Sequence, residues 1–198
     1  MINKIKEEAL INKVPIIKDD SLKYLLDLIK DNNFKDVLEL GTAVGYSSIM
    51  MACLSEDIKI DTLEKNDEMY LKAIENIKLM NLEDRINVYH LAIEEFETDK
   101  LYDFIFVDAA KAQYQKYLEK FLPNLKEEGM MFFDNMSFHG MTSNVEEIKN
   151  RNTRSLVKKI NKFKEAVRND ARFDIMIDES IGDGFLILKR RNSWNLKI

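Results

Sequence analysis

The sequence contains a single cysteine, so the chain cannot form an internal disulfide bond. This residue, Cys53, stands in an apolar stretch of helical character, and we expect it to be a buried free thiol. Only two prolines and six glycines interrupt the 198 residues, which predicts short loops. No apolar run approaches the roughly 20 residues that span a bilayer, and the charged N-terminus lacks the apolar core of a signal peptide. We therefore expect a cytoplasmic protein that does not enter a membrane.

The composition is that of one folded domain. A chain of 198 residues is long enough for one well-buried core and short for two. The sequence is 45% hydrophobic and 33% charged, which is typical of a soluble globular protein and excludes a disordered one. We find no internal repeat and no low-complexity tract, so we expect residues 1–198 to form a single domain.

The charges are distributed unevenly. The net charge of −5 disfavours bulk binding to nucleic acid. The segment 149–172, in contrast, contains nine Lys or Arg residues and two acidic residues, a local net charge of +7. Lys189, Arg190, Arg191 and Lys197 add positive charge near the C-terminus. Such a basic stripe can contact phosphate, or it can be a solvated helix face with an exposed tail, and charge alone does not choose between the two.

Hydrophobic periodicity predicts an α/β fold. Short apolar runs predict buried strands at 37–41, 59–64, 86–90, 103–108, 129–134, 173–178 and 185–189. Apolar residues spaced by three and four predict helices at 21–30, 67–80, 112–122 and 155–167. Asp20 or Ser21 is expected to cap the first helix, and Asn66 or Asp67 the second. The alternation predicts right-handed βαβ units, and hence a mostly parallel sheet with helices on both faces.

The last two predicted strands break this alternation. They are joined only by ESIGDG, a glycine-containing turn, which predicts an antiparallel hairpin at the edge of the sheet. In open α/β sheets, ligands bind beyond the carboxyl ends of the strands. We therefore expect the site at 39–47, at Glu64, at 108–111 and at 134–139.

A glycine loop follows the first strand. The strand ends at Glu39-Leu-Gly41, a short loop reaches Gly45, and a helix is predicted to begin near Tyr46. Glycines let the backbone approach a ligand closely, and a helix N-terminus offers free N–H groups. As a dinucleotide fingerprint the loop is poor, because Ala43 replaces the middle glycine of G-x-G-x-x-G.

Glu64 closes the next strand, where a carboxylate can accept hydrogen bonds from both hydroxyls of a ribose. The alternative is an acidic residue that only begins a helix. A glycine loop without phosphate spacing, followed by a ribose acid, favours a nucleoside ligand without a pyrophosphate. S-adenosylmethionine fits that description.

These segments resemble the metal-dependent class I O-methyltransferases that use S-adenosylmethionine, a family that includes catechol and caffeoyl-CoA O-methyltransferases. The resemblance rests on the loop from Glu39 to Ser47, on Glu64, and on the pairs Asp108…Lys111 and Asp134-Asn135. It runs from about Val14 to Arg190. It implies a single-domain Rossmann-like fold with a seven-stranded sheet, and a homodimer.

The same resemblance implies a divalent cation, Mg²⁺ or Mn²⁺, held by Asp108, Asp134 and Asn135. Two carboxylates and an amide oxygen suit such a hard cation, and no Cys or His cluster supports zinc. The alternative is that each acid merely begins a turn or caps a helix. Lys111 becomes the candidate catalytic base, since a cation lowers the pKa of a bound hydroxyl and a neighbouring amine can take the proton. The alternative for Lys111 is a solvated lysine.

The resemblance also implies the cofactor contacts. These are Ile17, Glu39, Gly41, Ser47, Glu64, Ala92 and Asp108. Residues 1–18 would form an N-terminal segment over the substrate and the cofactor, and residues 192–198 a tail. His139 could line the mouth of the substrate site, or could be a loop residue without a role.

Two classes of substrate fit the metal chemistry. One is a catechol-like or caffeoyl-CoA-type small molecule. The other is 5-hydroxyuridine at the wobble position of a tRNA anticodon loop, which would become 5-methoxyuridine. Its 5-hydroxyl and 4-carbonyl are adjacent oxygens that can bind one cation, and a single-stranded loop can present the base.

The segments VPI, DNMSFHG and R-N-x-R resemble the bacterial tRNA branch of the family more closely. We therefore favour tRNA, with Arg151, Arg154, Lys158 and Lys159 as the phosphate contacts. A binding module that has lost catalysis is a third reading, and the intact acidic and basic residues of the metal site argue against it.

Overall fold

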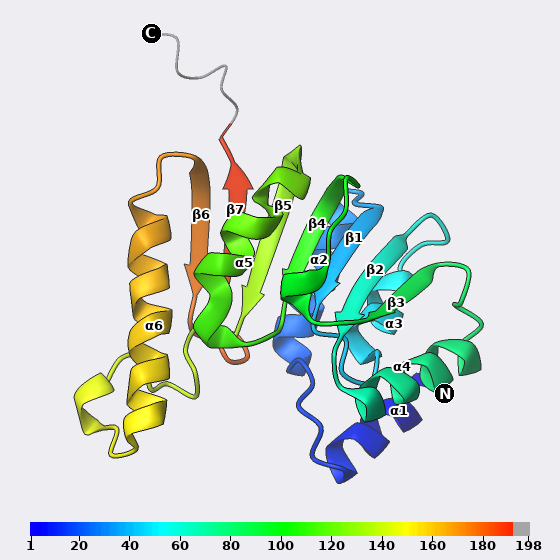
Figure 1. Ribbon diagram of the computed structural model, residues 1–198, viewed down its shortest axis with the longest axis horizontal. Coiled ribbons are helices and arrows are strands. Elements are labelled where there is room, and N and C mark those ends of the chain that lie inside the picture. Colours follow the sequence, from blue (N-terminus) through cyan, green and yellow to red (C-terminus); the bar gives the residue numbers. More distant parts are fainter. Residues whose placement is uncertain (192–198) are drawn as a thin grey trace, which may run out of the picture.

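The computed structural model describes residues 1–191, so the tail 192–198, which contains Lys197, lies outside the described residues. One seven-stranded sheet forms the centre, in the order β3-β2-β1-β4-β5-β7-β6 (Figure 1). Its strands are β1 (Asp36–Leu40), β2 (Lys59–Glu64), β3 (Ile86–His90), β4 (Tyr102–Val107), β5 (Leu125–Asp134), β6 (Phe173–Asp178) and β7 (Phe185–Arg190). All strands run in the same direction except β7, which is antiparallel to both of its neighbours. The expected α/β class and mostly parallel sheet are confirmed.

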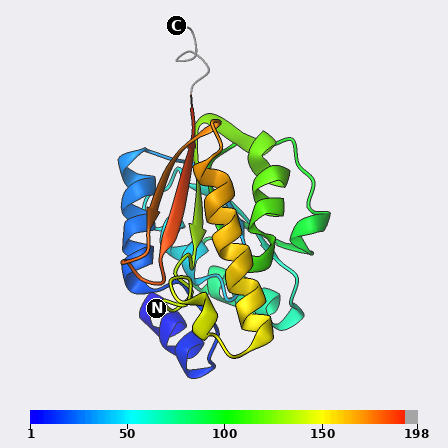
Figure 2. The ribbon, with the colours of Figure 1, turned by 90° about the vertical axis from the view of Figure 1, so that its left-hand side faces the viewer.

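Helices cover both faces of the sheet. They are α1 (Ile2–Ile11), α2 (Asp19–Asp31), α3 (Tyr46–Ala52), α4 (Asp67–Leu79), α5 (Tyr114–Phe121) and α6 (Arg151–Arg168), with short 3₁₀ turns η1 (Ile93–Glu95), η2 (Lys111–Gln113), η3 (Leu122–Asn124) and η4 (Val145–Glu147). The first four helices pack on one face and α5 and α6 on the other, as Figure 2 shows for α2 and α6 from the β6 edge. Within residues 1–191, no helix combines the length and the apolar composition that crossing a membrane requires.

The C-terminal hairpin is confirmed, and its arrangement is more specific than the sequence indicates. β7 lies between β5 and β6, where Phe185 pairs with Asp134 on one side and with Asp178 on the other. β6, the earlier strand of the two, therefore forms the edge of the sheet. The turn between them, at residues 179–184, returns to the carboxyl end of β5.

Two local predictions, the buried Cys53 and the cap at Asp20 or Ser21, need correction. Cys53 is exposed, because α3 ends at Ala52 and the cysteine is the first residue beyond it. α2 begins at Asp19 with Lys18 as its N-cap and no side-chain cap, so the capping role expected for Asp20 or Ser21 is wrong.

In contrast, the cap at Asn66 is confirmed, since its Oδ1 accepts a hydrogen bond from the backbone N–H of Met69.

α6 begins four residues earlier than the apolar pattern predicts. Asn150 caps a polar first turn that carries no hydrophobic stripe.

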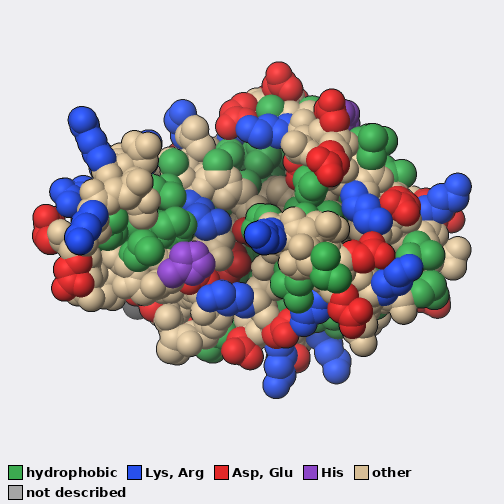
Figure 3. Space-filling model, turned by 90° about the horizontal axis from the view of Figure 1, so that it is seen from below, with side chains coloured by type: hydrophobic (Ala, Val, Ile, Leu, Met, Phe, Trp, Pro, Cys, Tyr) green, Lys and Arg blue, Asp and Glu red, His purple; other side chains and the backbone are tan. Residues whose placement is uncertain are grey.

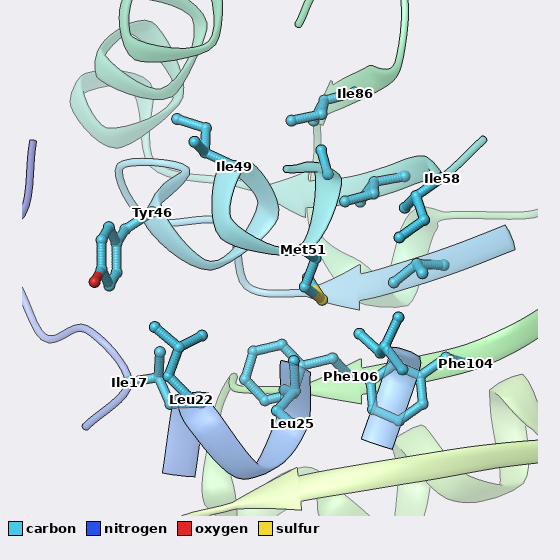
Figure 4. Packing of buried hydrophobic residues seen from close by; sticks show 14 of the residues in the cluster. Ile17, Leu22, Leu25, Tyr46, Ile49, Met51, Ile58, Ile86, Phe104 and Phe106 are labelled. Carbon is cyan, nitrogen blue, oxygen red and sulfur yellow. The ribbon is translucent and has the colours of Figure 1, made fainter. Parts of the chain in front are cut away.

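Aromatic side chains from neighbouring strands fill the core between the sheet and α2. Phe132 on β5 lies with its ring centroid 6.4 Å from Phe104, 5.8 Å from Phe106 and 5.0 Å from Phe185. Figure 4 shows Phe104 and Phe106 of this cluster facing Leu25 of α2. Alternate residues of the same strands, such as Ile105, point to the other face. Burial on both faces explains why these strands are continuous apolar runs.

Replacing Phe132 with alanine should lower the free energy of unfolding by about 3 to 5 kcal/mol, because the change leaves a cavity among three rings. The measurement is urea denaturation followed by circular dichroism. Leu71→Ala, at a site on α4 with 65% exposure, is the control and should change stability by no more than about 0.5 kcal/mol. Equal losses in the two variants would contradict this description of the core.

Candidate active site

A cavity of about 700 Å³ opens at the carboxyl edge of the parallel strands. Figure 3 shows this edge of the molecule, with a hollow near the middle of the view. The lining includes residues 14–18, the glycine loop, the end of β2, the segment after β3, residues 108–111 and 134–139, and the turn before β7. The site therefore lies where the α/β topology predicts it, beside the switch point between β1 and β4.

Gly41 brings the ends of β1 and β4 together. Its φ of +104° is a conformation that side chains disfavour, and a Cβ there would overlap the carbonyl oxygen of Asp108. The loop continues through Ala43, whose backbone N–H donates to Glu64 Oε2 at 2.9 Å. A glycine is therefore required at position 41 by close backbone packing, and the cavity wall forms around it.

Glu39 lies behind the cavity wall rather than in it. The side chain is fully buried, and its carboxylate accepts hydrogen bonds from the hydroxyls of Ser47, Ser48 and Thr62. Burial raises the pKa of Glu39 to about 7, although the three hydroxyls act in the opposite direction. Ser47 lines the cavity itself. Glu39 thus orients Ser47 at the start of α3. Any influence of Glu39 on the cavity passes through Ser47.

The carboxylate of Glu64 is held in place by the backbone. Its Oε2 accepts from Ala43 and its Oε1 accepts from the N–H of Asn66 at 2.8 Å, while the side chain still lines the cavity. Each oxygen keeps a second lone pair for a ligand hydroxyl.

Ile17, from the N-terminal segment, also lines the cavity. Ala92 lies between two lining residues, Leu91 and Ile93, and its N–H donates to Glu95 at 3.3 Å.

Two aspartates meet at the centre of the site. Asp108 directly follows β4 and Asp134 ends β5, and these strands are parallel neighbours. Burial raises the pKa of both carboxyl groups, and for Asp134 the nearby charge of Asp108 adds to the effect, giving a pKa of about 7. The charge of Lys111, in η2, lowers both pKa values. The three side chains, predicted from two separate motifs, therefore lie in one electrostatic cluster.

A hard divalent cation fits this cluster. Asp134 Oδ1 is buried and has no hydrogen-bond donor among the described residues. Asn135, at a left-handed φ of 60°, turns its Nδ2 toward Asp134 Oδ2 at 3.2 Å. In residues 1–191 no three His, Cys, Asp or Glu side chains group closely enough to hold a metal. A cation here would need a further oxygen besides the two carboxylates, and Asn135, which lines the same cavity, is the neighbouring side chain that carries one.

Sequence reasoning missed several residues of the site. Asp183, between two glycines of the hairpin turn, is buried and lines the cavity, as does Lys18. Tyr114 is buried beneath the acids and donates to the carbonyl of Asp134 at 2.8 Å. The IGDG turn could have indicated Asp183, since an acid flanked by two glycines marks a tight approach of the backbone.

The four basic residues predicted to contact phosphate lie together on α6. A shallow groove there is lined by Arg151, Arg154, Ser155, Lys158, Lys159 and Lys162. Arg154 donates from Nε and Nη2 to the carbonyl of Ile148, at 2.8 and 2.6 Å, so much of its donor capacity fixes the preceding loop. The N-terminal end of α6 lies at the same edge of the molecule as the cavity (Figure 1).

Comparison with known proteins shows consistent similarity. A family model described as O-methyltransferase matches residues 2–191. Caffeoyl-CoA O-methyltransferase of Populus kitakamiensis is 29% identical over 162 residues, which cover 77% of this chain and 68% of that protein.

Two solved structures are also similar. A protein of Staphylococcus aureus, named provisionally as a caffeoyl-CoA O-methyltransferase, has a TM-score of 0.92 and 35% identity, covering 96% of this chain and 92% of that chain. An O-methyltransferase from Bacillus cereus in complex with SAH has a TM-score of 0.82 and 25% identity, covering 96% and 90%.

Replacing Glu39 with glutamine should remove a pH dependence of stability. The folded carboxyl group keeps its proton up to a pKa of about 7, whereas the unfolded one releases it near 4.5. The contribution of this group is therefore complete below pH 4.5 and is lost as the pH rises to 7, by about 3 kcal/mol in total. The unfolding free energy of wild type minus that of the variant, from urea denaturation, should fall across this window and then stay level.

Asp178→Asn is the control for this experiment. Hydrogen bonds from Ser180 lower the pKa of Asp178 below its ordinary 3.8, so its contribution is lost only at more acidic pH. The corresponding difference should be constant from pH 4.5 to 8. A flat difference for Glu39→Gln as well would show that this carboxyl group titrates normally.

Proposed function

This chain belongs to the O-methyltransferase family, and from that premise we propose that it transfers the methyl group of S-adenosylmethionine to a substrate hydroxyl with the help of Mg²⁺ or Mn²⁺. The observation that carries the proposal is the meeting of Asp108, Asp134 and Lys111 in one cavity, where a buried carboxylate oxygen of Asp134 has no hydrogen-bond partner among the described residues.

The residues at the β1–β2 side of the cavity suit the cofactor. S-adenosylmethionine supplies the methyl group when it is bound. Glu64 would accept hydrogen bonds from its ribose hydroxyls, because both carboxylate oxygens are already oriented by backbone donors. Ser47 and the backbone at Gly41 would bind the methionine end, and Ile17 would cover it. Ala92 stays a predicted contact to the adenine.

The residues at the β4–β5 side suit the cation and the proton transfer. Asp108, Asp134 and Asn135 would hold the cation, which lowers the pKa of the substrate hydroxyl when it is bound. Lys111 lines the same cavity, and we assign its Nζ to take up the proton that the hydroxyl releases. Holding the acceptor oxygen in line with the methyl group is the main contribution of the rigid strand ends.

Wobble 5-hydroxyuridine in a tRNA anticodon loop is the substrate that we favour. The support is the basic groove on α6, whose N-terminal end shares an edge with the cavity. Arg151, Lys159 and Lys162 are exposed, with no ion pair among the described residues, so they are free to meet phosphate. Lys158 lies 3.9 Å from Glu146, a pair too exposed to prevent phosphate binding.

A catechol-like or caffeoyl-CoA-type small molecule is the second candidate. This candidate is favoured by the similarity to the Populus protein, which is named a caffeoyl-CoA O-methyltransferase. The two candidates share the same metal chemistry, and differ in whether α6 takes part. The homodimer and the cytoplasmic location expected from the sequence stay predictions.

Removal of divalent metal should abolish methyl transfer. After treatment with EDTA, labelled S-adenosylmethionine should transfer no methyl group to tRNA carrying hydroxyuridine or to a catechol, and Mg²⁺ should restore the reaction. Asp134→Asn should lower the rate by roughly 100-fold or more, because loss of a metal ligand is at least as damaging as loss of an outer partner. Asp174→Asn, exposed on β6, is the control and should keep full activity. Undiminished transfer in EDTA would disprove the metal assignment.

Neutralising the groove should separate the two substrates. The double variant Lys159→Gln/Lys162→Gln should bind tRNA more weakly and lower the slope of log K against log salt by about one to two, because two phosphate contacts are lost. Methylation of a catechol should not change. Arg168→Gln, at the other end of α6, is the matched control and should retain wild-type tRNA binding. Methylation of the catechol without any methylation of tRNA would select the small-molecule candidate.

A further inference from the structure

Asp183 holds together the segments that surround the acidic centre. The residue as a whole is only 3% exposed. Its Oδ1 accepts hydrogen bonds from the N–H of His139 at 2.6 Å and from Ser137 Oγ at 3.2 Å. Its Oδ2 faces Asn135 Nδ2 at 3.4 Å. We propose that Asp183 is a positioning residue that orients the amide of Asn135 for divalent cation binding, an inference that rests on the proposed function.

The orientation of the amide follows from its two neighbours. Asn135 Nδ2 lies between two carboxylates, 3.2 Å from Asp134 Oδ2 and 3.4 Å from Asp183 Oδ2. A carboxylate only accepts hydrogen bonds, so the rotated amide would set its oxygen against two negative groups. Asp183 thus keeps the N–H₂ group on its own side and leaves Oδ1 of Asn135 as a free oxygen ligand. Outer partners of this kind commonly fix the geometry of a metal ligand.

The backbone around Asn135 depends on the same turn. Asn135, Phe138 and His139 have φ values of 60°, 44° and 58°, which non-glycine residues seldom adopt. Such conformations persist only where the surroundings hold them. The N–H of Ser137 donates to the carbonyl of Asp183 at 2.8 Å, in addition to the contacts of the Asp183 side chain.

Gly184 permits this close approach, because a Cβ there would lie 2.7 Å from the Ser137 nitrogen. The hairpin turn therefore supports the loop that follows β5.

Lys18 balances the negative charge of Asp183. Its Nζ lies 3.7 Å from Asp183 Oδ1 and 3.3 Å from the carbonyl of Gly182. Asp183 thus has its own cationic partner at the edge of the cavity.

Binding of Mn²⁺ alone, without substrate or S-adenosylmethionine, tests the inference. Isothermal titration calorimetry on the full chain would compare wild type, Asp183→Asn, Asn135→Ala and the double variant. Asp183→Asn should weaken Mn²⁺ binding by roughly 10- to 100-fold. In the Asn135→Ala background, the same substitution should cause little further loss, because its effect passes through the amide. The same loss in both backgrounds would mean that Asp183 acts by charge alone, and would overturn the proposal.

Asp178→Asn is the matched control, since it removes one negative charge at the start of the same turn, where the side chain accepts hydrogen bonds from Ser180. It should bind Mn²⁺ as wild type does. If Asp183→Asn shows no cooperative unfolding transition, Asp183→Glu takes its place, because it keeps the charge and moves the acceptor by one methylene.

The outcomes also separate this inference from the proposed function. Wild type that binds no Mn²⁺ overturns the metal site, and the inference with it. Wild-type affinity in Asn135→Ala removes Asn135 from the ligand set. A loss in Asn135→Ala together with wild-type affinity in Asp183→Asn overturns the positioning role alone.

Discussion

The carboxyl edge depends on the register in which the parallel strands β1, β4 and β5 pair. Leu40 is level with Val107, and Val107 is level with Phe133, so the next residue of each strand stands in one row: Gly41, Asp108 and Asp134. This row presses the backbone of Gly41 against that of Asp108, which only a glycine permits. It also brings two carboxylates together where burial removes water. The geometry of the site is thus set by the hydrogen bonds of the sheet, which are more rigid than loops.

The fold leaves negative charge at this row without full compensation. Burial and the charge of Asp108 raise the pKa of Asp134, and its Oδ1 lacks a donor among the described residues. The raised pKa and the missing donor both mean that ionised carboxylates at this row lower the stability of the folded state. A cation that binds only the folded chain would reverse them and stabilise the protein. The buried carboxylate of Glu39 differs from that of Asp134, because three hydroxyls already donate hydrogen bonds to it and no ligand is needed to satisfy it.

The sequence predicts the strands and the meeting of Asp108 with Asp134 well, because both depend on short-range patterns. Strands buried on both faces must be apolar runs, and parallel neighbours end at one edge. Other features depend on contacts between distant segments. Asp183 reaches the site only because the β6–β7 turn folds back on the loop after β5, a contact that no spacing encodes. Likewise, Glu39 is expected to contact the cofactor, whereas in the structure its side chain is buried against the hydroxyls of Ser47 and Ser48 on α3 and of Thr62 on β2.

The position of β7 determines when the site can first be complete. This strand is the last one within residues 1–191, yet it pairs with β5 on one side and β6 on the other. Until residues 185–190 leave the ribosome, β6 has no partner and β5 exposes a free edge that ends at Asp134. An unpaired edge of this kind invites association with other chains. A chain that stops before residue 185 therefore lacks the antiparallel pairing that positions the turn of Asp183 against the loop after β5.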